Sequence, residues 1–269
     1  MLRHALLLLA LASCVLGARL PMRRLVHSGK WLGAAGGRIV GGQDAVPGQF
    51  PYQVSLQYVT WEFTLIECTG SLITPMRVLT AGHCCGATNT AVAGVVDLDG
   101  CEEAKQESKV LDQIYHPDFP VGYYGIYAND IAVFTLETAF TLNEYVQTIP
   151  LATAGSIPTV NSSAVGSAWG SSPDNLQWVE LSIIDYETCR QLVDDLGVIG
   201  ENFVVDTMVC TVPITDGVGL CSGDSGGPLV QDGALIGIAQ WSNVESGKGG
   251  VPSGFNRVSA FIDFINAHI

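Results

Sequence analysis

The sequence predicts an all-β fold, either a sandwich or a barrel. Short runs rich in Val, Ile, Leu, Thr and aromatic residues recur between Gly, Pro, Asn and Asp, which is the spacing of such folds rather than of alternating strands and helices. These runs cover residues 52–58, 71–80, 131–136, 178–184 and 229–241. Residues 186–196 and 259–268 have helical patterns, and Ser259 is a candidate cap for the second. With 269 residues, 48% of them hydrophobic, the chain can bury one large core or two fused small ones.

The N-terminal region divides into two predicted segments. Residues 1–17 have the order of a secretory signal peptide, since Arg3 and His4 precede an apolar run at 5–12 and small residues near Gly17. A membrane anchor is the alternative, but the run is shorter than the roughly 20 residues that cross a bilayer. Residues 18–38 are basic and Gly-rich and end in Arg38, which predicts a flexible, cleavable propeptide before a domain at 39–269. We therefore expect a secreted product without a membrane partner.

Charge is divided unevenly along the chain. Six of the 12 basic residues, and none of the 26 acidic ones, lie before residue 39, so a product starting at Ile39 carries a formal charge of −20. Such a surface repels phosphate groups, which argues against nucleic acid or anionic membranes as partners. It indicates solubility in an extracellular fluid, with an electrostatic substrate preference as the alternative.

The cysteines fit an extracellular setting. Loss of Cys14 with the signal peptide leaves seven, without a CxxC motif or a His-rich cluster, so disulfides explain them better than a metal does. They are Cys68, Cys84, Cys85, Cys101, Cys189, Cys210 and Cys221. Seven is an odd number, so at least one thiol is free or bonded outside the chain. Asn161 begins an N-glycosylation sequon in what we expect to be a surface loop.

The hexapeptide from Gly223 to Pro228, GDSGGP, is the most informative segment for chemistry. Three glycines around Ser225 allow a tight turn without crowding the hydroxyl, so that backbone N–H groups can point at an approaching carbonyl oxygen. An ordinary β-turn is the alternative for the segment alone. A serine hydroxyl is a poor nucleophile until a base takes its proton, so the hypothesis requires a histidine and a group that orients it.

Of the five histidines, His83 and His116 are candidates for that base, because His4, His27 and His268 lie in the signal peptide, the propeptide and the C-terminus. His83 follows an apolar run and precedes Cys84, which could pin it, whereas His116 lies in an apparent surface turn. Asp130 enters the apolar run 131–136, where a buried carboxylate is costly unless paired. Taken singly, a structural histidine and a strand-capping aspartate remain alternatives.

Together these segments resemble the chymotrypsin family of serine proteases. The motifs TAGHC, NDIAV and GDSGGP hold His83, Asp130 and Ser225 in that order, and Arg38 with the following IVGG resembles the activation site. The likeness runs from Ile39 to Ile269. It implies two six-stranded antiparallel β-barrels packed together, with a C-terminal helix.

The resemblance also implies roles for these residues. Ser225 is the expected nucleophile, His83 the base, and Asp130 the group that orients the imidazole; the N–H groups of Gly223 and Ser225 form the oxyanion hole. The chain is then an endopeptidase acting on proteins and peptides, without a metal or organic cofactor, and a target of protein protease inhibitors. We expect a monomer with a digestive role, and a regulatory protease is the alternative.

Activation and the disulfides follow from the same likeness. Cutting after Arg38, by a trypsin-like protease, frees the ammonium of Ile39, which in this family inserts beside the carboxylate preceding the nucleophile, here Asp224. The family's disulfides correspond to Cys68 with Cys84 and Cys189 with Cys210. A third pair, Cys85 with Cys101, is our own assignment, and Cys221 is then the odd thiol because its usual partner is absent from the sequence.

The expected specificity pocket is formed by Gly219, Gln240, Trp241, Ser242 and Ser253. Gly219 stands where trypsins have the aspartate that attracts Lys or Arg. Ser242 and Ser253 replace glycines that leave room for large rings, so we expect an elastase-like preference for small to medium apolar residues, followed by Phe, Tyr and Leu.

Two departures from the family pattern qualify the likeness. Gln240 replaces a serine that usually bonds the catalytic aspartate, and Val95 replaces a glutamate of the calcium site, so no calcium is expected despite the acidic residues at 97, 99, 102 and 103. A binding protein that keeps the fold without activity is the alternative from another class. Such relatives usually lose a triad residue or the activation cut, and this sequence has both.

Overall fold

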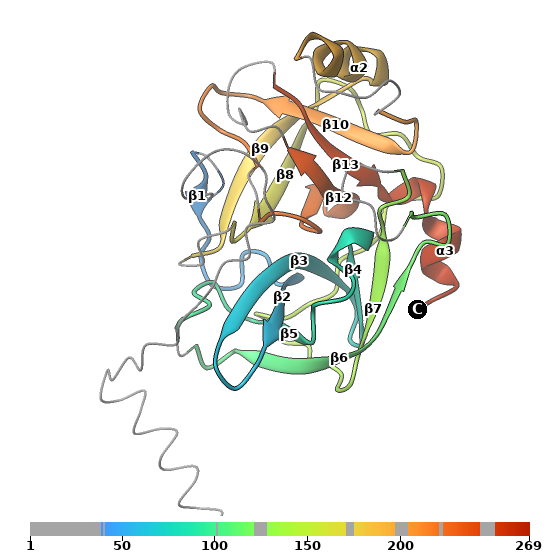
Figure 1. Ribbon diagram of the computed structural model, residues 1–269. Coiled ribbons are helices and arrows are strands. Elements are labelled where there is room, and N and C mark those ends of the chain that lie inside the picture. Colours follow the sequence, from blue (N-terminus) through green and yellow to red (C-terminus); the bar gives the residue numbers. More distant parts are fainter. Residues whose placement is uncertain are drawn as a thin grey trace, which may run out of the picture.

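The computed structural model describes residue 39 and residues 41–100, 102–120, 128–170, 175–196, 204–220, 223–242 and 251–269. The predicted signal peptide and propeptide lie outside these residues, as do Arg38, Cys101 and Cys221. Two lobes lie one above the other in Figure 1, with the earlier strands in the lower lobe and most later strands in the upper one.

The lower lobe is a closed barrel of six antiparallel strands in the order β2-β3-β4-β7-β6-β5. The strands are β2 (Gln53–Val59), β3 (Thr64–Thr74), β4 (Arg77–Thr80), β5 (Thr90–Ala93), β6 (Gln106–Tyr115) and β7 (Ala132–Leu136). Pairing of β2 with both β3 and β5 closes the ring. Closure removes the exposed strand edges that an open sheet would have.

The upper lobe is a second six-stranded antiparallel barrel. Its strands are β8 (Ser163–Ala168), β9 (Gln177–Ile184), β10 (Met208–Pro213), β11 (Pro228–Gln231), β12 (Ala234–Ser242) and β13 (Ser253–Arg257). The ring closes because β8 pairs with both β11 and β9, while the short β1 (Gln43–Asp44) adds to β9. The predicted fold of two six-stranded barrels is thereby confirmed.

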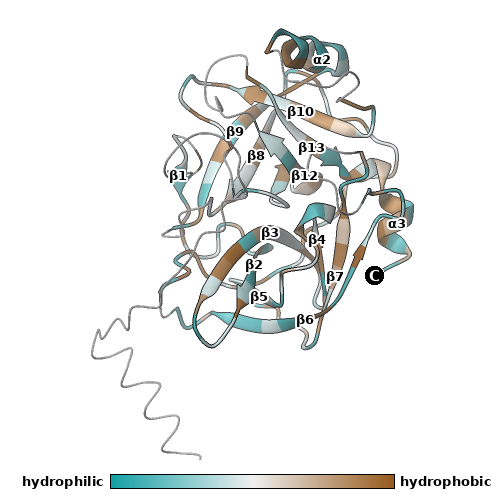
Figure 2. Ribbon diagram, viewed as in Figure 1, coloured by the Kyte–Doolittle hydropathy of each residue, from teal (hydrophilic) through white to brown (hydrophobic). Residues whose placement is uncertain are grey.

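The sequence runs locate several strands of both barrels but leave out the largely buried strands β5, β8, β10 and β13 as well as the exposed β6. The runs 71–80 and 229–241 each contain two strands; the second is divided at Asp232 and Gly233, whose φ angles of 50° and 76° suit a tight hairpin. β6 was not predicted because most of its residues are partly or fully exposed, so that it has no apolar run. Figure 2 shows it largely in the hydrophilic colour.

The two predicted helices differ in how well they match. α2 (Tyr186–Asp195) agrees with the prediction and begins at Asp185, whose carboxylate accepts a hydrogen bond from the N–H of Thr188. The C-terminal segment is instead a 3-10 turn, η2 (Val258–Ala260), followed by the short helix α3 (Ile262–Asn266). The predicted cap at Ser259 is wrong, because its hydroxyl lies within η2 and donates to the carbonyl of Ser156.

One apolar cluster joins the two barrels. It contains the inward-facing residues of the first barrel together with Leu235 and Ile238 of β12 and Val258, Phe261 and Ile265 of the C-terminal segment. A second cluster fills the upper barrel and includes Ile39, Leu229 and Phe255. The shared cluster therefore packs the first barrel against β12 and the C-terminal segment.

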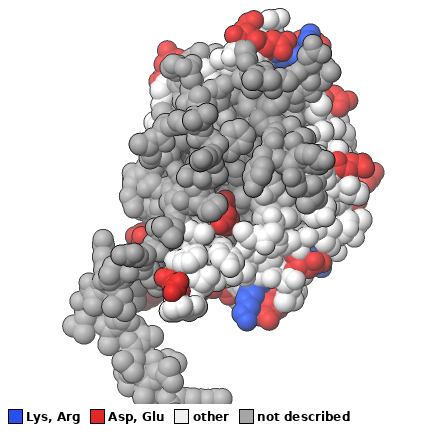
Figure 3. Space-filling model, viewed as in Figure 1, with Lys and Arg blue, Asp and Glu red and all other residues white. Residues whose placement is uncertain are grey.

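The surface is acidic over the described residues. Figure 3 shows acidic groups over α2 and along the lower lobe, with few basic groups among them. Within the described residues, no helix combines the length and the hydropathy needed to cross a bilayer.

The first barrel core gives a direct test of packing. Leu56 of β2 is fully buried, whereas Leu111 of β6 is 62% exposed. We expect Leu56→Ala to lower the free energy of unfolding by about 2 to 5 kcal/mol through lost burial and a residual cavity. Leu111→Ala, the matched control, should change it by less than about 0.5 kcal/mol. Urea unfolding of both variants measures the difference, and equal effects would contradict the assigned burial.

Candidate active site

His83 is fixed at the edge of the first barrel. It lies in the 3-10 turn η1 (Gly82–Cys84), which directly follows β4. A disulfide joins Cys84 to Cys68 of β3, and the Thr80 hydroxyl donates to the carbonyl of Thr69 at 2.8 Å. These cross-links hold the turn against β3, so the histidine main chain has little freedom.

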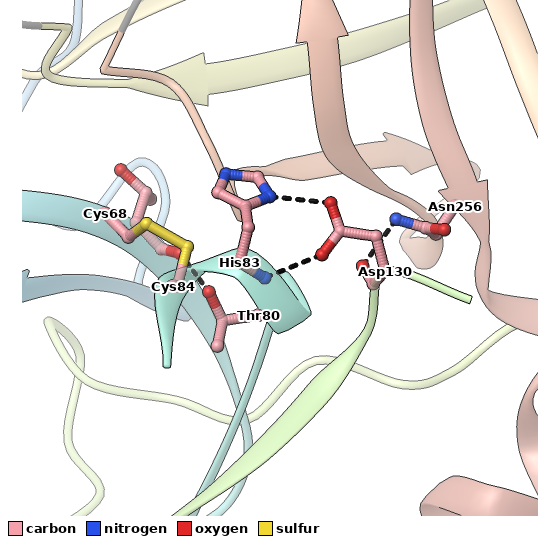
Figure 4. Close-up of polar contacts among 7 residues, drawn as sticks. Cys68, Thr80, His83, Cys84, Asp130 and Asn256 are labelled. Carbon is pink, nitrogen blue, oxygen red and sulfur yellow. Dashed lines mark hydrogen bonds and ion pairs between the residues drawn. A yellow bond between two sulfur atoms is a disulfide. The ribbon is translucent and has the colours of Figure 1, made fainter. Parts of the chain in front are cut away.

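Asp130 orients the imidazole of His83. The carboxylate is 3% exposed and accepts two hydrogen bonds from this one residue, from the backbone N–H at 2.7 Å and from Nδ1 at 2.6 Å. Figure 4 shows the ring turned with Nδ1 toward the carboxylate, which leaves Nε2 on the opposite edge. With Nδ1–H as donor, Nε2 is a free acceptor, which is the tautomer that a general base requires.

The pKa of His83 depends on the same contact. Burial lowers the pKa of this imidazole, but the negative charge of Asp130 and the hydrogen bond that His83 donates to it raise the pKa, and the net shift is above the ordinary value. The neutral ring that can accept a proton therefore forms only as pH rises through this raised pKa.

Ser225 lies on a turn of the second barrel that packs against the histidine segment. The turn is closed by a bond from the N–H of Gly227 to the carbonyl of Asp224 at 2.9 Å, and the Ser225 carbonyl accepts from the N–H of Thr69 at 2.8 Å. Gly226 has φ 76°, and a Cβ there would lie 2.1 Å from Oγ1 of Thr80. Only glycine allows this close approach, which brings Ser225 to the segment that carries His83.

The turn also leaves two donors without an acceptor among the described residues. No hydrogen bond from the N–H of Gly223 or of Ser225 to a described acceptor is present. Gly223 has φ 97°, a conformation that L side chains rarely adopt. Backbone donors in such a turn can bind the oxygen of a substrate carbonyl.

The residues expected to act in activation are both buried in the second barrel. Ile39 and Asp224 are each 2% exposed, and Ile39 belongs to the apolar cluster of that barrel. Two residues later, Gly41 has φ 61°, and a Cβ there would lie 2.3 Å from the carbonyl oxygen of Gly217. The segment that follows Ile39 thus packs closely against the segment that leads to Gly219.

The expected pocket residues come together on two paired strands. Ser242 of β12 lies opposite Ser253 of β13, and Trp241 lies opposite Gly254. Gln240 of β12 is buried, and so is Gly219, while the residues at 221–222 and 243–250 lie outside the described part of the chain.

The sequence did not point to two residues that lie next to expected pocket residues, Gly254 and Leu220. A Cβ on Gly254 would lie 2.1 Å from the ring of Trp241, so a glycine is required beneath the indole. A glycine inside a strand signals such close approach and could have been noticed. Leu220, beside Gly219, is 3% exposed and packs in the barrel core, for which only its hydrophobicity was a signal.

The disulfides include one correction. Cys68 with Cys84 and Cys189 with Cys210 are bonded, as the resemblance implies. The predicted pair of Cys85 with Cys101 is wrong, because Cys85 is a free cysteine. Cys85 caps η1, whereas Glu102, next to Cys101, accepts hydrogen bonds from the backbone at 96 and 97, beyond the far end of β5.

Metal binding has little support among the described residues. Ligand-type atoms of Cys68, His83 and Cys84 lie within 4.8 Å of one another, but the two sulfurs are bonded together and only the imidazole remains. In the acidic segment, Glu102 and Asp97 accept hydrogen bonds from backbone N–H groups, which account for these carboxylates without an ion.

Comparisons with known proteins agree on one family. The family model described as Trypsin matches residues 39–265. The chain is 33% identical over 245 residues to Trypsin-1 of Astacus astacus, covering 86% of this chain and 99% of that protein. It is 36% identical over 247 residues to Chymotrypsin-C of Bos taurus, covering 85% of this chain and 88% of that protein. The solved structure of mouse neuropsin, a serine protease, superimposes with a TM-score of 0.75 at 27% identity, covering 85% of this chain and 99% of that one.

The free thiol of Cys85 gives a test of the corrected disulfides. Burial, and then the negative charge of Asp130, raise the pKa of Cys85 to about 12. The thiolate is the reactive form, so iodoacetamide at pH 8 should label Cys85 in the unfolded protein and leave it largely unmodified in the native one. Peptide mass spectrometry measures both. Recovery of Cys85 in a disulfide-linked peptide would contradict the assignment.

Proposed function

The chain belongs to the trypsin family of serine proteases and is a serine endopeptidase, and we propose that it is secreted as a zymogen and cuts after small to medium apolar residues. In this proposal residues 1–17 are the signal peptide and residues 18–38 the propeptide. The catalytic assignment rests on the pair of hydrogen bonds between Asp130 and His83. It also rests on the contact of the Ser225 turn with Thr69 and Thr80, close to His83.

Each half of the proposed reaction uses two proton transfers. Ser225 Oγ attacks the scissile carbonyl carbon as His83 Nε2 takes its proton, and the tetrahedral intermediate places its negative oxygen against the N–H groups of Gly223 and Ser225. His83 then gives the proton to the leaving amine, and water repeats the sequence on the acyl-enzyme. Asp130 stabilises the imidazolium at each step. Each oxyanion donor contributes about 3 to 4 kcal/mol in such sites.

Activation is proposed to occur by cleavage after Arg38. The new ammonium of Ile39 would pair with the Asp224 carboxylate, and burial of both residues supports this because an unpaired buried carboxylate is costly. Before the cut the ammonium of Ile39 does not exist, so this charge pair cannot form. An arginine at the cut implies a trypsin-like activating protease.

The pocket supports the apolar preference. Ser242 and Ser253 are directly opposed on β12 and β13, so their side chains narrow one wall together. Gly219 offers no charge at the base for Lys or Arg. This range of substrates, with an acidic surface of low basic content, suits a digestive enzyme that acts as a monomer and is blocked by protein protease inhibitors. The exposed turn at Asn161, with φ 60°, is a proposed glycosylation site.

Activation and catalysis can be tested together. Trypsin treatment of the wild-type precursor should expose Ile39 as the new N-terminus and allow a fluorophosphonate to label Ser225. Arg38→Gln should stay uncut and at least about a hundredfold less active, while Ser225→Ala should be cut but remain unlabelled. N-terminal sequencing and labelling intensity measure these outcomes. A cut wild-type protein that neither labels nor hydrolyses peptides would favour the inactive binding protein instead.

Specificity can be tested with peptides varied at the residue before the cut. We expect the highest kcat/KM for Ala and Val, lower values for Phe, Tyr and Leu, and the lowest for Lys and Arg. The double variant Ser242→Gly with Ser253→Gly should raise the ratio of Phe to Ala cleavage by about tenfold or more, since pocket space discriminates by about 1 to 3 kcal/mol per methylene. Wild-type preference for Lys or Arg, or an unchanged ratio in the double variant, would overturn the pocket assignment.

A further inference from the structure

Asn256 joins the second barrel to the main chain of Asp130. It lies on β13, is 1% exposed, and donates from Nδ2 to the carbonyl oxygen of Asp130 at 2.6 Å. The two residues are 126 positions apart in the sequence and belong to different barrels. Figure 4 shows Asn256 approaching Asp130 from the side opposite His83. The aspartate is thus held on both sides, by His83 through its carboxylate and by Asn256 through its backbone.

The side chain of Asn256 has an energetic cost at this position, because its amide oxygen is buried without a described partner. Oδ1 of Asn256 is buried and accepts no hydrogen bond from any described residue. A buried polar atom left without a partner costs about 1 to 3 kcal/mol, and the hydrogen bond from Nδ2 to Asp130 offsets part of that cost. The carbonyl of Asp130 can only accept, which fixes the amide with its NH₂ group toward Asp130.

The backbone that the amide holds is itself in an uncommon conformation. Asn129, directly before Asp130, has φ 62°. Such conformations persist when surrounding contacts fix them, and they are often found at functional sites. The bond from Asn256 is one of those contacts, and it acts one residue away, on the group that orients His83.

The register of the second barrel relates Asn256 to the nucleophile. Asn256 lies opposite Ile238 on β12, and Ile238 lies opposite Pro228 on β11. Pro228 begins the strand that follows the Ser225 turn. Asn256 and Pro228 are therefore aligned across two strand spacings, about 10 Å in a sheet with strands about 4.8 Å apart. A rigid, paired sheet connects the point that holds Asp130 to the turn that carries Ser225.

We propose that Asn256 is a positioning residue for the reaction, whose amide sets the main chain of Asp130, and through it the imidazole of His83, relative to Ser225. This inference rests on the proposed function, because it assigns to Asn256 a role in aligning that triad. Displacements of about 1 Å in such groups can lower a rate by about a hundredfold. The hydrogen bond from Asn256 to Asp130 involves no residue of the proposed specificity pocket. Its loss should therefore lower kcat rather than change KM.

The test replaces the donor with an apolar group of similar size. Asn256→Leu, activated by cutting after Arg38, should lose about tenfold or more in kcat per titrated active site, with KM changed by less than about threefold. The contact of Asp130 with His83 would also loosen, so the acid limb of the kcat/KM profile should move to lower pH, toward the ordinary value of an imidazole. Peptide hydrolysis from pH 5 to 9 measures both.

Two control variants make the result decisive. Asn256→Ala repeats the test without the branched side chain, in case Leu overfills the site. Ser71→Ala removes another buried polar atom that has no described partner, on β3 of the first barrel, and should leave kcat and the acid limb unchanged. If Asn256→Leu and Asn256→Ala both fold and match the wild type in kcat and acid limb, the inference is overturned while the proposed function stands. A wild type that is inactive after cutting would instead refute the proposed function.

Discussion

The carboxylate of Asp130 is the group on which the rest of the site depends. At 3% exposure an ionised carboxylate is stable only with partners, and His83 supplies two hydrogen bonds to it from one residue. That requirement fixes the backbone of η1, selects the Nδ1–H tautomer and raises the pKa of the imidazole. The disulfide at Cys84 and the bond from Thr80 to Thr69 then limit how far this turn can move. The base is thus oriented before any substrate arrives.

The barrels contribute different parts of the reaction, so their relative position matters as much as either fold. The first barrel carries His83 and Asp130, and the second carries Ser225. Polar connections that cross between them include those of Thr69 with Ser225, Asn256 with Asp130, and Gln53 with Ser167. The apolar cluster shared by both barrels fills the space behind these bonds. Dense packing of this kind transmits small displacements, which explains why residues outside the triad can affect alignment.

The pocket and the activation segment share the second barrel. Trp241 packs on Gly254, the two serines face each other across β12 and β13, and Ile39 is buried in the same barrel core. Burial of a new N-terminus would therefore act on the same body that holds the pocket and the oxyanion donors. In the proposed activation, one backbone cut would organise both binding and catalysis.

The sequence by itself determined the chemistry of the triad segments, the all-β class and the strands with apolar runs, because strand periodicity and turn glycines are properties of neighbouring residues. It did not reveal β6, whose exposed residues form no apolar pattern, or the division of the C-terminal segment into η2 and α3. Only the tertiary structure decided that Cys85 is free, that Ser259 bonds Ser156, and that Asn256 reaches Asp130. Each of these features depends on which distant segments come into contact when the complete barrels pack. Such contacts cannot be predicted from the spacing of neighbouring residues.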